Sequence, residues 1–253
     1  FCVVPYTRGA EYSRSVSEII IEVKKLASLG VKEVTLLGQN VNAYHGKGKD
    51  LNDNESVFSL SDLCDQLSKI KNLHRIRYIT SHPADMKDEL IQAHKHNLKL
   101  MPYLHLPIQA GSNKILKEMN RRYTKEKYLT IVDKLRKAKP DLALTSDFIV
   151  GFPGETHKDF DETIDLVKII RFAGSYSFKY SPRPGTPASL INNLTDDSVS
   201  DKRLKVLQSI LKTQQEEFND SFIGNKLSVL IEKKGKKKES ICWKKSISTT
   251  CSY

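Results

Sequence analysis

Long apolar runs and several common catalytic motifs are absent from this 253-residue sequence. No apolar run approaches the ~20 residues that a membrane-spanning helix needs, and no signal-peptide pattern is present. There is no phosphate loop of the Gly-x-x-x-x-Gly-Lys-Ser/Thr type, no Gly-x-Ser-x-Gly elbow and no His-Glu-x-x-His helix. These absences disfavour a membrane protein, a P-loop enzyme, a serine hydrolase of the elbow type and a zinc protease.

Cysteine is scarce, and its four positions (Cys2, Cys64, Cys242 and Cys251) show no disulfide-framework spacing, which favours a reducing cytoplasm. We expect Cys64 to be a small buried residue on the apolar stripe of a helix. Cys242 and Cys251 lack companions at zinc-binding spacing and are interpreted as stray thiols. Cys2 lies in a loop-like opening segment that does not begin with methionine. It is therefore a candidate cluster ligand whose partner cysteines would lie upstream.

Positive charge is in excess and is unevenly distributed. The net charge is +11. Residues 226–253 contain eight lysines against two glutamates, or +6, which leaves +5 for the rest of the chain. Such a balance suits a polyanionic partner such as RNA, although a solvated lysine-rich surface is the alternative.

Helical and strand-like periods alternate along the chain. The spacing of apolar residues predicts helices over residues 15–29, 60–70, 87–94, 113–119, 124–139, 157–172 and 199–222. Buried strands are predicted over residues 31–37, 75–80, 103–106, 142–150 and 175–180. The polar residues 44–56 predict a surface loop, and residues 227–232 predict a strand of a different, β-rich domain. Beyond Glu239 the periodicity is lost and we predict no element.

Five strands, each followed by a helix, indicate an α/β fold with a parallel sheet. Ligands of such sheets bind at the carboxyl ends of the strands. Polar or glycine-bearing segments follow each strand, at residues 38–40, 81–83, 105–112, 151–156 and 181–188. The sequence therefore predicts a site built from these segments.

Several residues in these segments are candidates for binding. The two glycines and the proline of residues 151–156 would let the backbone approach a ligand, although a tight strand-to-helix turn is the alternative. Asp147 is expected to point into the barrel, to hold ribose hydroxyls or to pair with a lysine. Gln109 offers donors and an acceptor at a strand end. His105 alternates with leucines, so a hydrogen-bonded core histidine is favoured over a metal ligand.

Taken together, residues 2–9, 36–44, 105–112, 147–156 and 180–188 resemble the radical S-adenosylmethionine (SAM) methylthiotransferases. The resemblance implies a radical-SAM-type partial (β/α) TIM-like barrel that lacks its first strand, over residues 1–223. It implies the start of a small RNA-binding β-barrel, the TRAM domain, over residues 224–253. Residues 240–253 depart from the family pattern, and we interpret them as an altered tail.

The resemblance also implies the cofactors. Cys2 matches the third cysteine of a Cys-x-x-x-Cys-x-x-Cys loop that holds a 4Fe–4S cluster, one iron of which is left open for SAM. The cluster and SAM supply the radical chemistry, and the barrel positions and shields them. With only one of the three cysteines the ligand set is incomplete, so we expect this chain alone to be inactive. The residues expected around SAM and the substrate base, none with a proton-transfer role, are Gln39, Asn40, Ser81, Gln109, Asp147 and Arg183.

Within the family the resemblance is strongest to the type that converts N6-isopentenyladenosine next to the tRNA anticodon into its 2-methylthio derivative. Asn40 and Arg183 point to this type, because relatives that modify a ribosomal protein usually carry aspartate at the Asn40 position. The expected partners are the tRNA anticodon stem-loop, an external electron donor and a sulfur source, with a monomeric, cytoplasmic protein and no membrane.

Other functions stay open at this point. One alternative is a methylthiotransferase that acts on threonylcarbamoyladenosine in tRNA or on a ribosomal protein. Another is a non-catalytic RNA-binding remnant. A third is an ordinary α/β-barrel enzyme that acts on a phosphorylated metabolite.

Overall fold

The computed structural model describes residues 7, 9–50, 52–234, 241–247 and 251–252, with the backbone alone for residues 232–234, 241–244 and 251–252. Cys2 lies outside the described residues. Within that part of the chain, no helix combines the length and the apolar character needed to cross a membrane.

Five parallel strands form the centre of the fold, as predicted. They are β1 (Glu33–Leu36), β4 (Arg75–Tyr78), β5 (Tyr103–His105), β6 (Ala143–Val150) and β7 (Gly174–Lys179). β1 pairs with β4, and β6 lies between β5 and β7. A single bridge between Ile76 and Leu100 links the two groups. Among the described strands β1 and β7 do not pair, so the sheet is open and not a closed barrel.

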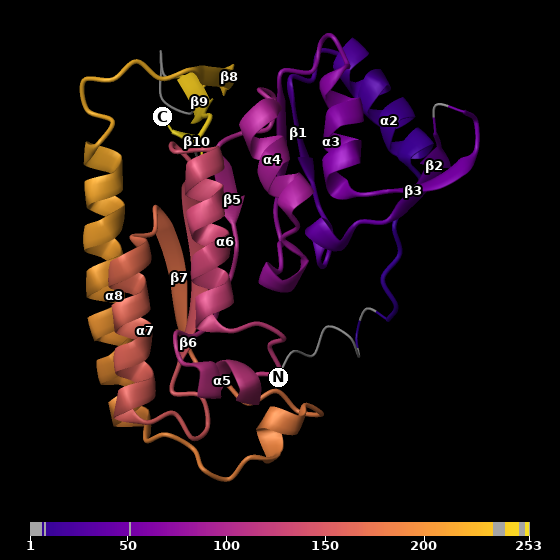
Figure 1. The fold of residues 1–253 in the computed structure, drawn as a ribbon. Coiled ribbons are helices and arrows are strands. Elements are labelled where there is room, and N and C mark those ends of the chain that lie inside the picture. Colours follow the sequence, from indigo (N-terminus) through magenta and orange to yellow (C-terminus); the bar gives the residue numbers. More distant parts are fainter. Residues whose placement is uncertain (1–6, 8, 51, 235–240, 248–250, 253) are drawn as a thin grey trace.

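Seven helices of the described part of the chain cover one face of the sheet (Figure 1); α2 precedes β1, and the others follow strands. They are α2 (Val16–Ser28), α3 (Leu60–Ser68), α4 (Asp88–His96), α5 (Asn113–Glu118), α6 (Lys125–Ala138), α7 (His157–Ile170) and α8 (Asp197–Asp220). Capping boxes begin three of them, at Ser15, Ser59 and Thr156, where hydroxyl and carboxylate oxygens satisfy otherwise free backbone N–H groups. Short 3₁₀ turns follow three strands: η1 (Val41–Ala43), η2 (Pro83–Asp85) and η3 (Pro187–Leu190).

The two faces of the sheet differ in burial. On β6, Phe148 and Val150 are fully buried, whereas Asp147, on the opposite face, is partly exposed. The register places Asp147 opposite Tyr176 and Ile149 opposite Phe178 on β7. Tyr176 and Phe178 are 68% and 55% exposed. Since parallel sheets are normally covered on both faces, this open face is available for a ligand or for another part of the protein.

Two of the predictions for irregular segments are wrong. Residues 44–56 form an antiparallel hairpin, β2 (Gly46–Lys49) with β3 (Glu55–Phe58), where a surface loop was predicted. Gly48 lets Phe58 pack closely, because a Cβ at this position would lie 2.9 Å from the Phe58 ring. A strand made of glycine and lysine has no apolar alternation, which is why periodicity did not detect it.

The C-terminal segment also contains more structure than predicted. After α8 the chain forms an antiparallel sheet of β8 (Val229–Lys234), β9 (Ile241–Lys245) and β10 (Cys251–Ser252), although no element was predicted beyond Glu239. Figure 1 shows this sheet at one end of the molecule and α5 at the other.

A buried arginine joins the C-terminal sheet to the parallel sheet. Arg77 on β4 is 1% exposed and donates from Nη2 to the carbonyls of Lys245 and Ser246, at 2.7 and 2.8 Å. Its Nε donates to Glu33 on β1 at 3.1 Å. Arg75 donates to the carbonyl of Ser228 at 3.2 Å. These contacts fix the C-terminal sheet beside the strands that carry Glu33 and the two arginines.

The core is continuous under the helices. Cys64 is fully buried in it, as predicted. Burial raises the pKa of its thiol to about 12, so this cysteine is a neutral packing residue at physiological pH.

Candidate functional site

The segments after β1 and β4 are joined by side-chain hydrogen bonds. The Asn42 amide donates to the His82 carbonyl at 2.9 Å, and the His82 backbone N–H donates back to Asn42 Oδ1 at 2.8 Å. The Asn40 amide donates to Asp85 Oδ2 at 2.7 Å. The structure thereby brings two predicted site residues, Asn40 and Ser81, onto one side of the site.

Three buried polar atoms beyond the carboxyl ends of the strands have no hydrogen-bond partner among the described residues. They are Oδ1 of Asn40 after β1, Oγ of Ser81 after β4 and the hydroxyl of Tyr180 after β7. Ser81 is 6% exposed. Because buried polar atoms are normally paired, three such atoms in loops at this end of the sheet indicate a polar ligand.

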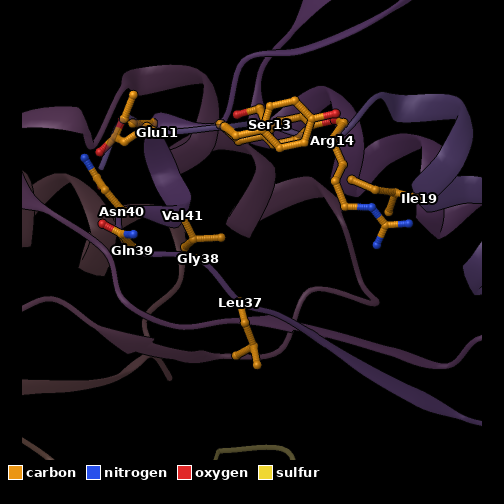
Figure 2. A pocket seen from close by; sticks show the side chains of 13 residues that line it. Glu11, Ser13, Arg14, Ile19, Leu37, Gly38, Gln39, Asn40 and Val41 are labelled. Carbon is orange, nitrogen blue, oxygen red and sulfur yellow. The ribbon is translucent and has the colours of Figure 1, made fainter. Parts of the chain in front are cut away.

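A cavity of about 470 Å³ lies beside Asn40. It is lined by residues 10–14, Ile19 and the segment after β1. Figure 2 shows Gln39 and Asn40 on one side of it and Arg14 and Ile19 on the other. Four of the predicted site residues do not line this cavity: Ser81, Gln109, Asp147 and Arg183.

Gln109, on the segment after β5, lies next to Asp147 on β6. The Gln109 N–H donates to the Asp147 carbonyl at 3.0 Å. The Asp147 carboxylate lies 3.3 Å from Nε2 of His105, whose Nδ1 lies 2.9 Å from the Thr145 hydroxyl. The prediction of a hydrogen-bonded His105 is confirmed. Asp147 pairs with this histidine and not with a lysine.

Two residues in the segments that follow strands have positive φ values, in the left-handed region. Thr80 after β4 has φ 66° and Gln109 after β5 has φ 80°. Such values are unfavourable for residues with a Cβ, and most of all for a β-branched one. Strain of this kind is typical of ligand sites, where the surrounding structure holds it. Residue type did not predict it at either position.

Residues 151–156 form a turn that is closed by its own carboxylate. Glu155 accepts from the Gly151 N–H at 2.8 Å and from Arg203 Nη1 at 2.7 Å. Both side chains of this ion pair are buried, and burial raises the pKa of Glu155. A Cβ on Gly151 would lie 2.2 Å from the Ser200 hydroxyl. Gly151 and Glu155 are therefore explained by the tight strand-to-helix turn, which the sequence offered as the alternative to a ligand-binding loop.

Arg183 is exposed and stands apart from the other predicted site residues. Its carbonyl accepts from the Thr186 N–H and hydroxyl at 3.2 and 2.8 Å, which shapes the turn after β7. The structure thus groups Asn40 with Ser81 and Gln109 with Asp147, but does not connect Arg183 to either pair. No three His, Cys, Asp or Glu side chains in the described part of the chain are placed to hold a metal ion.

His82 is a site residue that the sequence did not single out. Its Nδ1 accepts from the Ala84 N–H at 3.3 Å, so the neutral ring carries its proton on Nε2. Burial lowers the pKa of His82, and the positive charges of Arg121 and Arg122 lower it further. The ring packs edge-on against Tyr123, with 5.3 Å between centroids. His82 is therefore a neutral donor beside Ser81, close to a pair of arginines.

Comparison with known proteins establishes the family. Residues 1–167 match the model of the radical SAM superfamily. The chain belongs to the radical SAM superfamily. Membership implies a 4Fe–4S cluster and SAM as cofactors.

Among the most similar curated relatives are proteins named tRNA-2-methylthio-N(6)-dimethylallyladenosine synthase. The chain is 52% identical to the Rickettsia felis protein over 244 residues, which is 96% of this chain and 54% of that protein. It is 54% identical to the Maricaulis maris protein over 236 residues, 93% of this chain and 52% of that protein. The chain is thus a homologue of this MiaB type, as its sequence predicted, and spans about half the length of these relatives.

Solved structures support the fold. The coproporphyrinogen III oxidase HemN from Escherichia coli, a radical SAM enzyme, aligns with a TM-score of 0.55 at 16% identity, over 79% of this chain and 45% of that one. The radical SAM methyltransferase TsrM from Kitasatospora setae aligns with a TM-score of 0.53 at 14% identity, over 70% of this chain and 33% of that one. At such identities the likeness concerns the α/β radical SAM fold and not the substrate.

The residues present fit a polar cofactor such as SAM. SAM carries amino, carboxylate and hydroxyl groups, and the unpartnered atoms of Asn40, Ser81 and Tyr180 offer one amide acceptor and two hydroxyls.

Proposed function

We propose that the protein to which this chain belongs is a tRNA methylthiotransferase of the MiaB type. It would convert N6-isopentenyladenosine next to the anticodon into the 2-methylthio derivative, with SAM and 4Fe–4S clusters as cofactors. The observation that carries the proposal is the identity of 52–54% over 93–96% of the chain to synthases of that name.

The unpartnered polar atoms are the part of the site that we assign to SAM. Oδ1 of Asn40 accepts a hydrogen bond, and the hydroxyls of Ser81 and Tyr180 donate or accept one, which satisfies all three on binding. When bound, SAM and the cluster supply the radical chemistry. The chain itself orients the cofactor and keeps water from it. No proton transfer is assigned to these residues.

The open face of the sheet is the part that we assign to the substrate base. Gln109, on the segment after β5, bonds the Asp147 carbonyl on β6, and Tyr176, opposite Asp147, adds an exposed aromatic ring. An aromatic surface beside hydrogen-bonding groups suits a nucleobase that enters from a single-stranded loop. We include Gln39 and Arg183 as contacts at the edge of the site.

The pairing of Asn40 favours the tRNA type over relatives that modify a ribosomal protein. Its amide donates to the Asp85 carboxylate at 2.7 Å. An aspartate at this position would place two carboxylates against each other, which is unfavourable unless one takes up a proton. The segment after β4 is therefore complementary to asparagine at position 40.

Two assignments extend the proposal beyond the described site. Cys2 is assigned as one of three thiolate ligands of the radical SAM cluster. Residues 224–253 are assigned as the start of an RNA-binding TRAM domain, following a radical SAM core over residues 1–223. The antiparallel β8–β10 sheet and the lysine-rich composition after Gly224 support the second assignment.

Binding of SAM tests the proposal at the level of single atoms. In the full-length, cluster-reconstituted protein, Ser81→Ala and Tyr180→Phe each remove one unpartnered hydroxyl. Each is expected to weaken SAM binding about tenfold, because loss of one hydrogen bond to a polar ligand costs about 1–2 kcal/mol. Ser68→Ala is the matched control, since its hydroxyl is exposed and bonds a helix carbonyl. Unchanged affinity in both site variants, measured by equilibrium dialysis, would remove these atoms from the SAM site.

A further inference from the structure

One basic stretch outside the C-terminal segment lies close to the candidate site. Residues 113–127 carry a net charge of +4. This stretch contains two acidic residues, Glu118 and Glu126, and six basic ones: Lys114, Lys117, Arg121, Arg122, Lys125 and Lys127.

The stretch comprises α5, the turn that follows it and the first residues of α6. The Tyr123 hydroxyl donates to the Ile108 carbonyl at 3.1 Å, and its ring contacts His82. Lys114 Nζ donates to the Gly154 carbonyl in the turn after β6, at 2.7 Å. The stretch is therefore attached to the segments after β4, β5 and β6, at the carboxyl ends of the strands. Figure 1 shows α5 at this end of the molecule.

Some of these charges are already neutralised. Lys114 and Lys125 form ion pairs with Asp159 and Glu162, each at 3.1 Å. Three further side chains are exposed and form no ion pair within the described part of the chain. We call Lys117, Arg122 and Lys127 the rim cations. Exposed cations without carboxylate partners are available for phosphate groups.

The described strands of the other basic segment lie at the opposite end. Arg75 bonds Ser228, just before β8, and Arg77 bonds Lys245 on β9, whereas α5 lies beyond the far end of α6 (Figure 1). A helix of the length of α6, 14 residues, extends about 21 Å. The phosphates on either side of a base that enters the site lie at the carboxyl ends of the strands, beyond direct reach of β8 and β9.

We propose that the rim cations bind backbone phosphates of the RNA that flank the target base. This inference rests on the proposed function, because it takes the substrate to be an RNA. It separates two roles of positive charge: the rim cations hold the nucleotides next to the site, and the lysines after Gly224 contact a more distant part of the RNA. Phosphate contacts carry no sequence information, so the rim cations position the RNA and do not select the base.

The test compares two triple variants of equal charge. Lys117→Gln, Arg122→Gln and Lys127→Gln together remove the rim cations. The control removes Lys24, Lys95 and Lys205, which are also exposed and without an ion pair within the described residues. Binding of a fluorescent anticodon stem-loop RNA to the chain is measured by anisotropy over a series of salt concentrations. The rim variant is expected to bind about tenfold more weakly, with a salt slope smaller by about two to three. The control is expected to retain the slope and most of the affinity.

Three outcomes overturn the inference in distinguishable ways. Equal losses in the two variants would mean that the rim cations act only through net charge. An unchanged rim variant would mean that they do not touch the RNA. No salt-dependent binding by the unchanged chain would count against the RNA substrate itself, and so against the proposed function as well. The single variant Arg122→Gln repeats the test with the smallest change to the fold. It is expected to reduce the slope of binding against salt concentration by about one.

Discussion

Replacing Arg77 by methionine tests how the C-terminal sheet is held. Arg77 makes three charge-assisted hydrogen bonds, two to the Lys245 and Ser246 carbonyls and one to Glu33. Methionine keeps the apolar stem but leaves the Glu33 carboxylate and both carbonyls without the guanidinium. Removing one partner of a buried ion pair costs about 3–5 kcal/mol, a large part of a typical stability of about 5–15 kcal/mol. We expect Arg77→Met to lower the free energy of unfolding by that amount.

Urea denaturation measures the loss, and hydrogen exchange locates it. The amides of β9 are expected to lose protection in Arg77→Met while those of β6 keep theirs. Arg14→Met is the control, since its ion pair with Glu22 is half-exposed and its loss should leave stability nearly unchanged. A loss for Arg77→Met no larger than that for Arg14→Met would refute the reasoning.

Three further predictions follow from single contacts. Gly111→Ala should lower the free energy of unfolding by at least about 2 kcal/mol in a urea melt, because its Cβ would lie 2.5 Å from backbone atoms of α7. Gly38→Ala is the control and should be nearly neutral, because the nearest atom to its Cβ would lie 3.6 Å away. Equal losses of stability in the two variants would contradict this prediction. Asn40→Asp should lower the free energy of unfolding by about 1 kcal/mol, because it places a second carboxylate against Asp85. Adding Asp85→Asn should restore most of this loss. A double variant no more stable than Asn40→Asp would argue against the pairing. Burial lowers the pKa of His94 to about 4, against about 6.5 when unfolded, so the unfolded chain binds a proton that the folded chain does not. The His94 contribution should therefore lower the free energy of unfolding by roughly 3 kcal/mol as pH drops from about 6.5 to about 4, and should be constant above this range. His94→Gln should lack this contribution. The same dependence of stability on pH in His94→Gln as in the unchanged protein would contradict the prediction.

The parallel sheet could be predicted from the sequence because its strands are buried. Residues 142–150 are apolar at both ends, at 142–144 and 148–150, and have the length expected for such a strand; β6 covers Ala143–Val150. The hairpin of β2 and β3 could not be predicted in this way. Its strands contain glycine and lysine, and it depends on Phe58 and on contacts with α2. Periodicity detects burial and not pairing.

The site was predicted in part for a similar reason. The polar segments after the strands indicated where the site lies, since strand ends meet at one edge of a sheet. The left-handed conformations of Thr80 and Gln109 depend on neighbouring segments and not on residue type. The role of Arg77 depends on carbonyls 168 and 169 positions further along the chain. No local pattern predicts a partner at that distance.

The modified nucleosides of tRNA test the central claim most directly. In cells of the source organism from which the gene for the full-length protein has been deleted, tRNA is digested and its nucleosides are measured by mass spectrometry. The account predicts that 2-methylthio-N6-isopentenyladenosine disappears while N6-isopentenyladenosine accumulates, and that the intact gene restores the methylthio form. An unchanged level of the methylthio nucleoside in the deletion strain would contradict it.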